Sequence, residues 1–169
     1  MAAISRLTAR RFAAIVLAAS LGVLGAAMAS QYWGGLSPCE LCLLQRWPWR
    51  VAIIVSAIAL AAGERHPMSL IAVLLGLVFL AGAGLAFYHV GVEQHWFAGP
   101  TACTAGGADA GNVDALRAQL IGKQPVLCDQ VQWSLVGISL AGWNLLASLG
   151  MAAFCIAAAR HRRLQQVAV

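Results

Sequence analysis

Four apolar runs constrain this chain more than any motif does, because a helix needs roughly 20 apolar residues to cross about 30 Å of hydrocarbon. The runs cover about residues 12–29, 41–62, 68–88 and 135–159 of the 169-residue sequence. With 61% hydrophobic and only 10% charged residues, the chain has too little polar surface to cover a water-soluble globule. The sequence therefore predicts an all-α membrane protein, a four-transmembrane-helix bundle that forms a single membrane domain over residues 1–169.

The second run is the least regular of the four. Its uncharged part, residues 51–62, is too short to cross a bilayer, so the helix must begin near Leu41. It then includes Gln45, Arg46 and Pro48 in its outer turns. Pro48 lacks a backbone N–H, a loss that costs less near the start of a helix than in its middle.

Basic residues lie at the ends of the runs and are divided unequally between the two sides. They form no patch with interleaved aromatic residues, which argues against a nucleic-acid partner despite the net charge of +5. One side has a single acid, Glu64, and seven basic residues: Arg6, Arg10, Arg11, Arg65, Arg160, Arg162 and Arg163. The other side has five acids and four basic residues: Arg46, Arg50, Arg117 and Lys123. The positive-inside rule places both termini in the cytoplasm and the outer loops, 30–40 and 89–133, on the opposite side of the membrane.

The N-terminus also has features of a cleavable signal peptide. Arg10-Arg11 precedes an apolar stretch that ends in Ala27-Met28-Ala29. The 18-residue run is longer than the usual apolar region of about 7–15 residues in such peptides. We therefore expect the first span to be retained.

The outer loop at 89–133 is too long for a simple connector, which suggests that it is functional. Within it, residues 113–121 place Val113, Leu116 and Leu120 on one helical face. This pattern predicts a short helix at the bilayer surface. Five tryptophans lie near the outer ends of the spans, where most are expected to form an interfacial belt: Trp33, Trp47, Trp49, Trp96 and Trp133.

Two cysteine pairs are predicted on the outer side. Cys39 and Cys42 form a CxxC motif at the start of the second span, and Cys103 and Cys128 lie in the long loop. Haem attachment is disfavoured because Leu43, rather than histidine, follows the motif. An oxidising outer compartment favours thiol–disulfide chemistry at both pairs.

Arg46 and His89 are the candidate residues for binding an electron acceptor. Arg46 follows Cys42 by four residues, so both lie on one helical face. A guanidinium there favours the reactive thiolate, and it can also stabilise an anionic reduced acceptor. His89 is placed to donate a hydrogen bond or a proton to that acceptor. Arg50, Glu93 and His95 are weaker candidates.

These features resemble the bacterial disulfide bond formation protein B (DsbB) family. The similarity includes Cys39-Glu-Leu-Cys42 with Arg46, the loop cysteines, and the Trp133…Gly137-Ile-Ser139…Trp143-Asn144 run. It extends over the four spans and both outer loops. The resemblance implies an oxidoreductase that reoxidises a periplasmic thioredoxin-like oxidase (DsbA-like) and passes the electrons to ubiquinone or menaquinone.

The resemblance also implies a role for each cysteine. Cys103 would form the mixed disulfide with the partner and release Cys128, which would exchange with Cys39. Cys42 would then face the quinone as the thiolate, beside Arg46 and His89.

Two alternatives remain open. Quinone reductases resembling vitamin K epoxide reductase also join four helices to two cysteine pairs, but in them the loop pair precedes the CxxC. A membrane metal-binding or assembly protein would use Cys39, Cys42, His89 and His95 as ligands.

Overall fold

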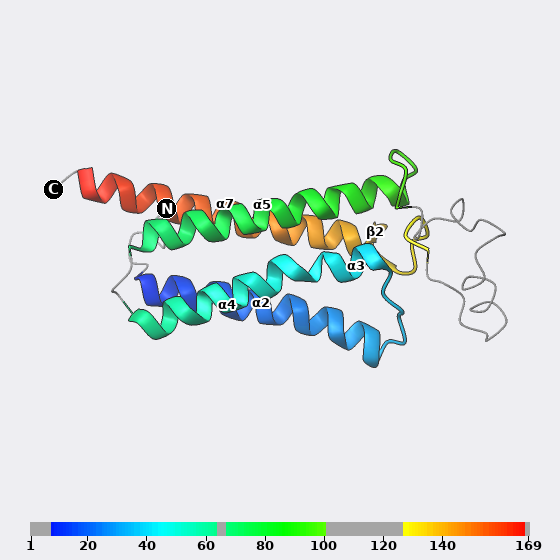
Figure 1. Cartoon of the computed structure of the whole chain (residues 1–169), viewed down its shortest axis with the longest axis horizontal. Coiled ribbons are helices and arrows are strands. Elements are labelled where there is room, and N and C mark those ends of the chain that lie inside the picture. The colour runs from blue at the N-terminus through cyan, green and yellow to red at the C-terminus, as the bar shows by residue number, and fades with distance from the viewer. Residues whose placement is uncertain (1–7, 64–66, 101–126, 168–169) are drawn as a thin grey trace.

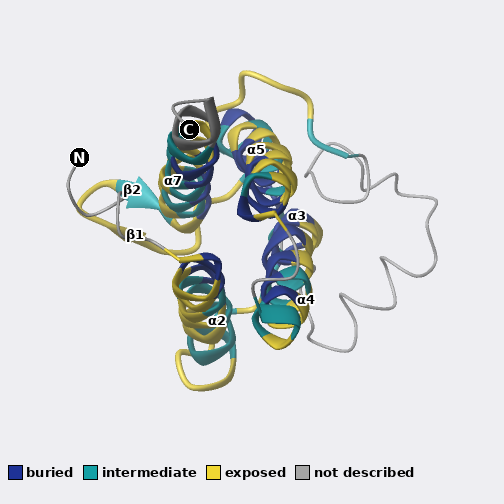
Figure 2. Cartoon of the chain, turned by 90° about the vertical axis from the view of Figure 1, so that its left-hand side faces the viewer, coloured by how far each residue is buried: buried dark blue, intermediate teal, exposed yellow. Residues whose placement is uncertain are grey.

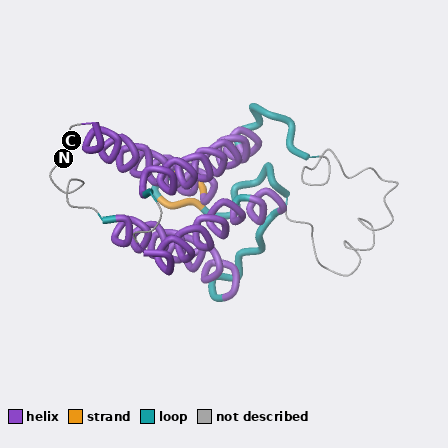
Figure 3. Tube along the Cα trace, turned by 60° about the vertical axis from the view of Figure 1, so that its left-hand side comes forward, coloured by secondary structure: helices purple, strands orange, loops and turns teal. Residues whose placement is uncertain are grey.

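The described part of the chain is a bundle of long helices, as Figure 1 and Figure 3 show. The computed structural model describes residues 8–63, 67–100 and 127–167, with side chains as far as residue 162. The helices are α2 (Ala9–Tyr32), α3 (Glu40–Leu44), α4 (Arg46–Ala62), α5 (Met68–Glu93) and α7 (Leu140–Val167). An antiparallel hairpin of β1 (Ser134–Leu135) and β2 (Ile138–Ser139) precedes α7. The predicted surface helix at 113–121 lies outside the described residues.

In the part of the chain that the structure describes, four helical segments are long and apolar enough to cross a membrane, which confirms the predicted bundle. They are Ala9–Tyr32, Glu40–Ala62, Met68–Glu93 and Leu140–Arg162. The ends of two helices differ from the ends of the predicted spans. The third helix continues past residue 88 to Glu93, and the fourth starts at Leu140 rather than at 135. His89 therefore belongs to a helix and not to the outer loop.

The helices pack as two pairs around a common core. α5 lies along α7 and α2 lies along α4, while contacts between α4 and α5 join the pairs. Figure 2 shows buried residues facing the centre and exposed residues facing outward. The outward side chains include large apolar ones such as Ile54, Ile58 and Leu77, as contact with lipid requires.

The second span is made of two helices that meet at Gln45. α3 ends at Leu44 and α4 begins at Arg46, so Pro48 is the third residue of α4. The first N–H groups of a helix have no partner within it, which is why the proline is tolerated there. Pro48 also packs close to α5, because a Cβ on Gly82 would lie only 3.1 Å from its Cβ.

A tight hairpin explains why the fourth helix starts later than predicted. Leu135 pairs with Ile138, and the two residues between them, Val136 and Gly137, have φ of 54° and 75°. Two positive φ values match the right-handed twist of a hairpin. Trp143 of α7 donates a hydrogen bond to the Leu135 carbonyl at 3.3 Å and so ties the hairpin to the helix.

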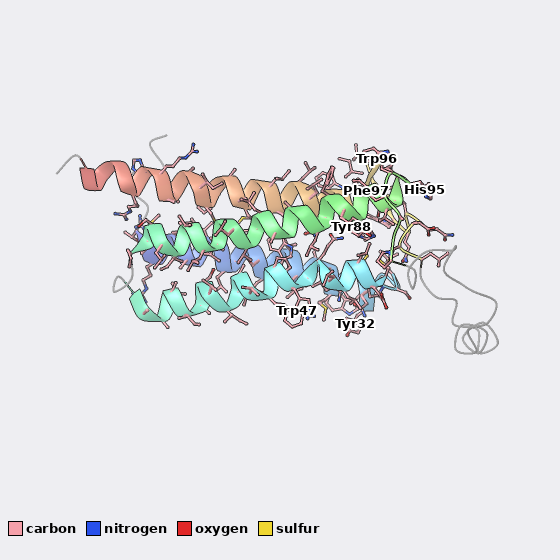
Figure 4. All side chains as sticks on the ribbon, turned by 45° about the horizontal axis from the view of Figure 1, so that its top comes forward. Tyr32, Trp47, Tyr88, His95, Trp96 and Phe97 are labelled. Atoms are coloured by element: carbon pink, nitrogen blue, oxygen red, sulfur yellow. The ribbon has the colours of Figure 1, made fainter. Side chains whose placement is uncertain are left out.

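Four of the five tryptophans expected in the interfacial belt are exposed: Trp33, Trp47, Trp96 and Trp133. Figure 4 shows Trp47 on the outside of the bundle, and Trp96 among the aromatic residues at one end. Trp49 is the exception, because only 2% of it is exposed and its ring packs against Phe79 in the core. The expectation, which covered most of the five tryptophans, agrees with the exposure of four, and Trp49 is the core residue among them.

Candidate functional site at the cysteine end of the bundle

The start of α3 brings the CxxC sulfurs together. Cys39 is the N-cap residue, and its Sγ accepts a hydrogen bond from the Cys42 backbone N–H at 3.3 Å. Residues three apart on a helix lie on one face. The thiol of Cys39 accordingly donates to Cys42 Sγ, with the two sulfur atoms 3.0 Å apart. The pair is a dithiol placed to close a disulfide with little movement.

The two thiols of the pair are not equivalent. Cys39 lies just before the span and is 4% exposed. Donation of its proton to Cys42 raises the pKa of Cys39 to about 12, and burial acts in the same direction. The nearby His89 side chain opposes this by lowering the pKa. Cys39 is therefore the proton-holding member of the dithiol.

Alkylation of Cys39 in the reduced protein should depend steeply on pH. With a pKa near 12, only about one Cys39 side chain in 10,000 is a thiolate at pH 8. The rate of iodoacetamide labelling at Cys39, followed by peptide mass spectrometry, should rise about tenfold per pH unit from pH 8 to pH 11. A plateau near pH 9, as for an ordinary thiol, would contradict this assignment.

The described cysteine of the second pair lies beside the first pair. Cys128 is 1% exposed and belongs to a small buried cluster with Cys39, Leu41 and Val92. Cys42 packs against the same cluster. The structure thus brings together three of the four predicted redox cysteines, while Cys103 lies outside the described residues. Cys155 is buried in the separate core of the bundle.

His89 faces the cysteine pair from α5. Its Nε2 lies 3.6 Å from Cys39 Sγ, and its Nδ1 lies 2.5 Å from Gln45 Nε2. Glu93, one turn further along α5, places Oε1 3.9 Å from the same Nε2 and accepts a hydrogen bond from Ser139 at 2.5 Å. The histidine is thus held by residues on three sides.

Arg46 is a buried cation held by α2. It is 8% exposed, and its guanidinium donates to Gln31 Oε1 at 2.8 Å and to Met28 Sδ at 3.4 Å. Within the described ranges, no carboxylate forms an ion pair with it, and its hydrogen bonds do not go to Cys42. A buried cation without an anion is costly. The guanidinium is therefore suited to an anionic or polarised ligand.

A cavity of about 440 Å³ joins these groups. This volume lies within the range of about 300–1,000 Å³ usual for small-molecule sites. One part of the wall is apolar, with Val23, Leu24 and Ala27 of α2. The cavity is also lined by polar, aromatic and sulfur-containing side chains: Cys39, Cys42, Gln45, Arg46, His89, Glu93, Trp143 and Asn144.

The alternative metal site is only partly assembled. Cys39, Cys42 and His89 offer ligand atoms within 4.8 Å of one another. His95, the fourth predicted ligand, lies outside this group, on an exposed turn after α5 where its φ is 59°. Arg50 contacts the ring of the exposed Trp47, with 5.2 Å from its Cζ to the ring centroid, and so faces outward.

Sequence reasoning missed several polar residues of the site. Gln45 was identified as a residue of the second span, and Asn144 as part of the run that resembles the DsbB family, without a role for either. Gln31 was not identified. A polar amide within an otherwise apolar span was the available signal, because such groups in lipid need partners.

The fold and this site together define a multi-pass membrane protein with a redox-competent dithiol beside an apolar cavity at one end of its bundle. A sequence model described as "Disulfide bond formation protein DsbB" matches residues 9–158. The chain therefore belongs to the DsbB family and is a membrane protein of disulfide bond formation.

Individual relatives agree with this assignment. A "Disulfide bond formation protein B" from Methylococcus capsulatus is 33% identical over 144 residues, covering 79% of this chain and 84% of the relative. Proteins with the same description from Aromatoleum aromaticum and Marinobacter nauticus are 29% and 31% identical. They cover 88% and 86% of this chain, and 90% and 91% of their own lengths. No solved structure matches the chain.

Proposed function

We propose that this protein takes electrons from a periplasmic thioredoxin-like (DsbA-like) dithiol oxidase and passes them to ubiquinone or menaquinone in the membrane. Both termini would be cytoplasmic, and the cysteine end of the bundle would face the periplasm. The observation that carries the proposal is the position of the Cys39–Cys42 dithiol in the wall of an apolar cavity that also contains the Arg46 guanidinium.

The cavity has the chemistry that a quinone requires. Its apolar wall on α2 suits a ring that dissolves in lipid, and Arg46 supplies a donor for a quinone oxygen. A positive charge at that oxygen is most useful when negative charge develops there during reduction. Burial strengthens the effect, because the effective dielectric constant of the site is lower than that of water.

The dithiol supplies a balanced two-electron step. Closing the Cys39–Cys42 disulfide would release two electrons and two protons, which are the equivalents needed to reduce a quinone to a quinol. The Cys39 thiol donates to Cys42 Sγ, so Cys42 is the sulfur that is prepared to act as thiolate. We assign Cys42 as the residue that faces the acceptor, with Cys39 closing the disulfide behind it.

The second pair would then restore the dithiol. Cys128 packs in the cluster that contains Cys39, so exchange between these two sulfurs needs little rearrangement. Cys103 would take the mixed disulfide with the partner. Partner oxidases of this kind have reduction potentials of about −120 mV. For a two-electron couple, each 30 mV corresponds to about 1.4 kcal/mol. An acceptor of high potential is therefore needed to draw the electrons forward.

Anaerobic mixing of the purified protein with a reduced thioredoxin-like oxidase and ubiquinone tests the proposal. Quinone absorbance should fall by one equivalent for each partner disulfide that forms. Oxidation of the partner without loss of quinone would refute the electron route. Stoichiometric bound metal together with no quinone reduction would instead support the metal-binding alternative.

Arg46→Ala should weaken the use of quinone more than the use of the partner. Loss of a charge-assisted hydrogen bond worth about 1.5–3 kcal/mol raises the apparent KM for quinone by about 10- to 100-fold. The KM for the partner should stay unchanged. Arg50→Ala is the matched control, because Arg50 faces outward against Trp47. Equal KM values for quinone in the two variants would show that Arg46 does not contribute to quinone binding.

A further inference from the structure

A chain of side-chain hydrogen bonds runs from the core of the bundle to the redox cysteines. Trp49 Nε1 donates to Asn144 Oδ1 at 2.8 Å, and Asn144 Nδ2 donates to Gln45 Oε1 at 2.5 Å. Gln45 Nε2 meets His89 Nδ1, and His89 Nε2 reaches Cys39 Sγ. This series of hydrogen bonds joins α4, α5 and α7 to Cys39, the residue just before α3.

The direction of this chain is fixed at its inner end. An indole N–H can only donate, so Asn144 must present its oxygen to Trp49 and its NH₂ group to Gln45. Gln45 must then accept with its oxygen and present its own NH₂ group to His89. A nitrogen that accepts from this group carries no proton. The proton of the neutral His89 ring is therefore on Nε2.

Both groups that face Nε2 agree with this assignment. Cys39 Sγ, at 3.6 Å, has already directed its own proton to Cys42, and Glu93 Oε1, at 3.9 Å, is an acceptor. His89 is only 3% exposed, so water offers little competition for either nitrogen. Gln45 and Trp49 are also buried, at 6% and 2% exposure. A buried network of this kind is stable when each member is satisfied in one direction.

We infer that Trp49, Asn144 and Gln45 are positioning residues that hold His89 as the Nε2–H tautomer, with this N–H directed at the Cys39 sulfur. The hydrogen bond from this N–H group to the Cys39 sulfur would act during thiol exchange. Exchange between Cys128 and Cys39 would produce a Cys39–Cys128 disulfide. When a thiolate attacks Cys128 in that disulfide, the new S–S bond forms on Cys128 and the bond from Cys128 to Cys39 breaks. Cys39 Sγ keeps the electron pair, and the Nε2–H hydrogen bond stabilises that charge.

The inference rests on the proposed function only for this use in exchange, because the tautomer itself is a property of the folded protein. ¹⁵N NMR of ¹⁵N-histidine-labelled, reduced protein reports the tautomer directly. The signals of His89 are assigned by their loss in His89→Gln. We expect a protonated Nε2 and an unprotonated Nδ1. A protonated Nδ1 in the unmodified protein would overturn the inference.

Two isosteric variants test whether the chain sets the tautomer. In Gln45→Glu, a carboxylate replaces the NH₂ group at Nδ1. In Asn144→Asp, the second carboxylate oxygen turns the Gln45 amide around, although residue 144 does not touch His89. Both changes should transfer a proton to Nδ1. The exposed Gln94→Glu is the matched control and should leave the His89 spectrum unchanged.

The outcomes separate this inference from the proposed function. An unprotonated Nδ1 in both Gln45→Glu and Asn144→Asp would overturn the positioning role, whatever the protein does with quinone. The expected shifts in a protein that fails to reduce quinone would support the network and refute the proposed electron route.

Discussion

Cys42→Ser is expected to reduce quinone reduction to the background rate while the bundle stays folded. A serine hydroxyl has nearly the size of the thiol but cannot form a disulfide with Cys39, so the pair can no longer release two electrons to an acceptor. The loss should be complete rather than partial, because no described cysteine other than Cys39 and Cys42 lines the cavity. Anaerobic quinone absorbance with a reduced partner measures it. Cys103→Ser should cause the same loss at the partner step.

Cys155→Ala is the control for this result. Cys155 is fully buried among apolar residues of the bundle and does not line the cavity. Its replacement should cost about 1 kcal/mol of stability at most, through a small cavity, and leave the rate of quinone reduction unchanged. Normal quinone reduction by Cys42→Ser would show that electrons do not pass through the Cys39–Cys42 dithiol.

The number of spans was predictable because the bilayer imposes it. Every backbone polar group in hydrocarbon needs an internal partner, and an apolar run of sufficient length satisfies this only as a helix. The ends of the spans were less predictable. The segment from His89 to Glu93 mixes polar and apolar residues, and its contacts with the cysteine end, through Val92 and His89, are not visible in the sequence. Two-residue strands such as β1 and β2 leave no periodic signal.

The candidate site was also predictable from the sequence only in part. Spacing along one helix predicted that Cys39, Cys42 and Arg46 would gather at the start of the second span, and all three line one cavity. Spacing also suggested a direct interaction between Arg46 and Cys42, whereas the guanidinium donates its hydrogen bonds to side chains of α2. Partners on other helices depend on packing angles that the sequence of one helix does not specify.

Trp49 shows this limit most clearly. Most tryptophans near the outer ends of the spans were expected at the membrane boundary, and the sequence did not distinguish Trp49 from the others. In the bundle, the indole instead faces Asn144 on α7, 95 residues away in sequence, and packs on Phe79. A donor that needs a partner and an amide that needs a donor satisfy each other. Neither residue alone indicates the pairing.

A disulfide between Cys39 and Cys128 should form in high yield when their proposed partners are removed. In the double variant Cys42→Ser, Cys103→Ser, the sulfurs of Cys39 and Cys128 remain as neighbours in the buried cluster with Leu41 and Val92. Mild oxidation should then join them. Disulfides form between cysteines whose Cα atoms are about 4.4–6.8 Å apart, so contact within one cluster favours the bond. Peptide mapping by mass spectrometry without reduction measures the yield.

The same background supplies the control for this disulfide. Adding Cys128→Ser should remove the cross-link completely and leave Cys39 as a thiol, since Cys155 is in the separate core of the bundle. A cross-link from Cys39 to Cys155, or one between two protein molecules at the expense of the Cys39–Cys128 bond, would contradict the packing of the two pairs. A high yield would show that Cys39 and Cys128 are close enough to exchange electrons between the two pairs. The exchange would then occur inside a buried cluster, where water cannot compete for the thiolates.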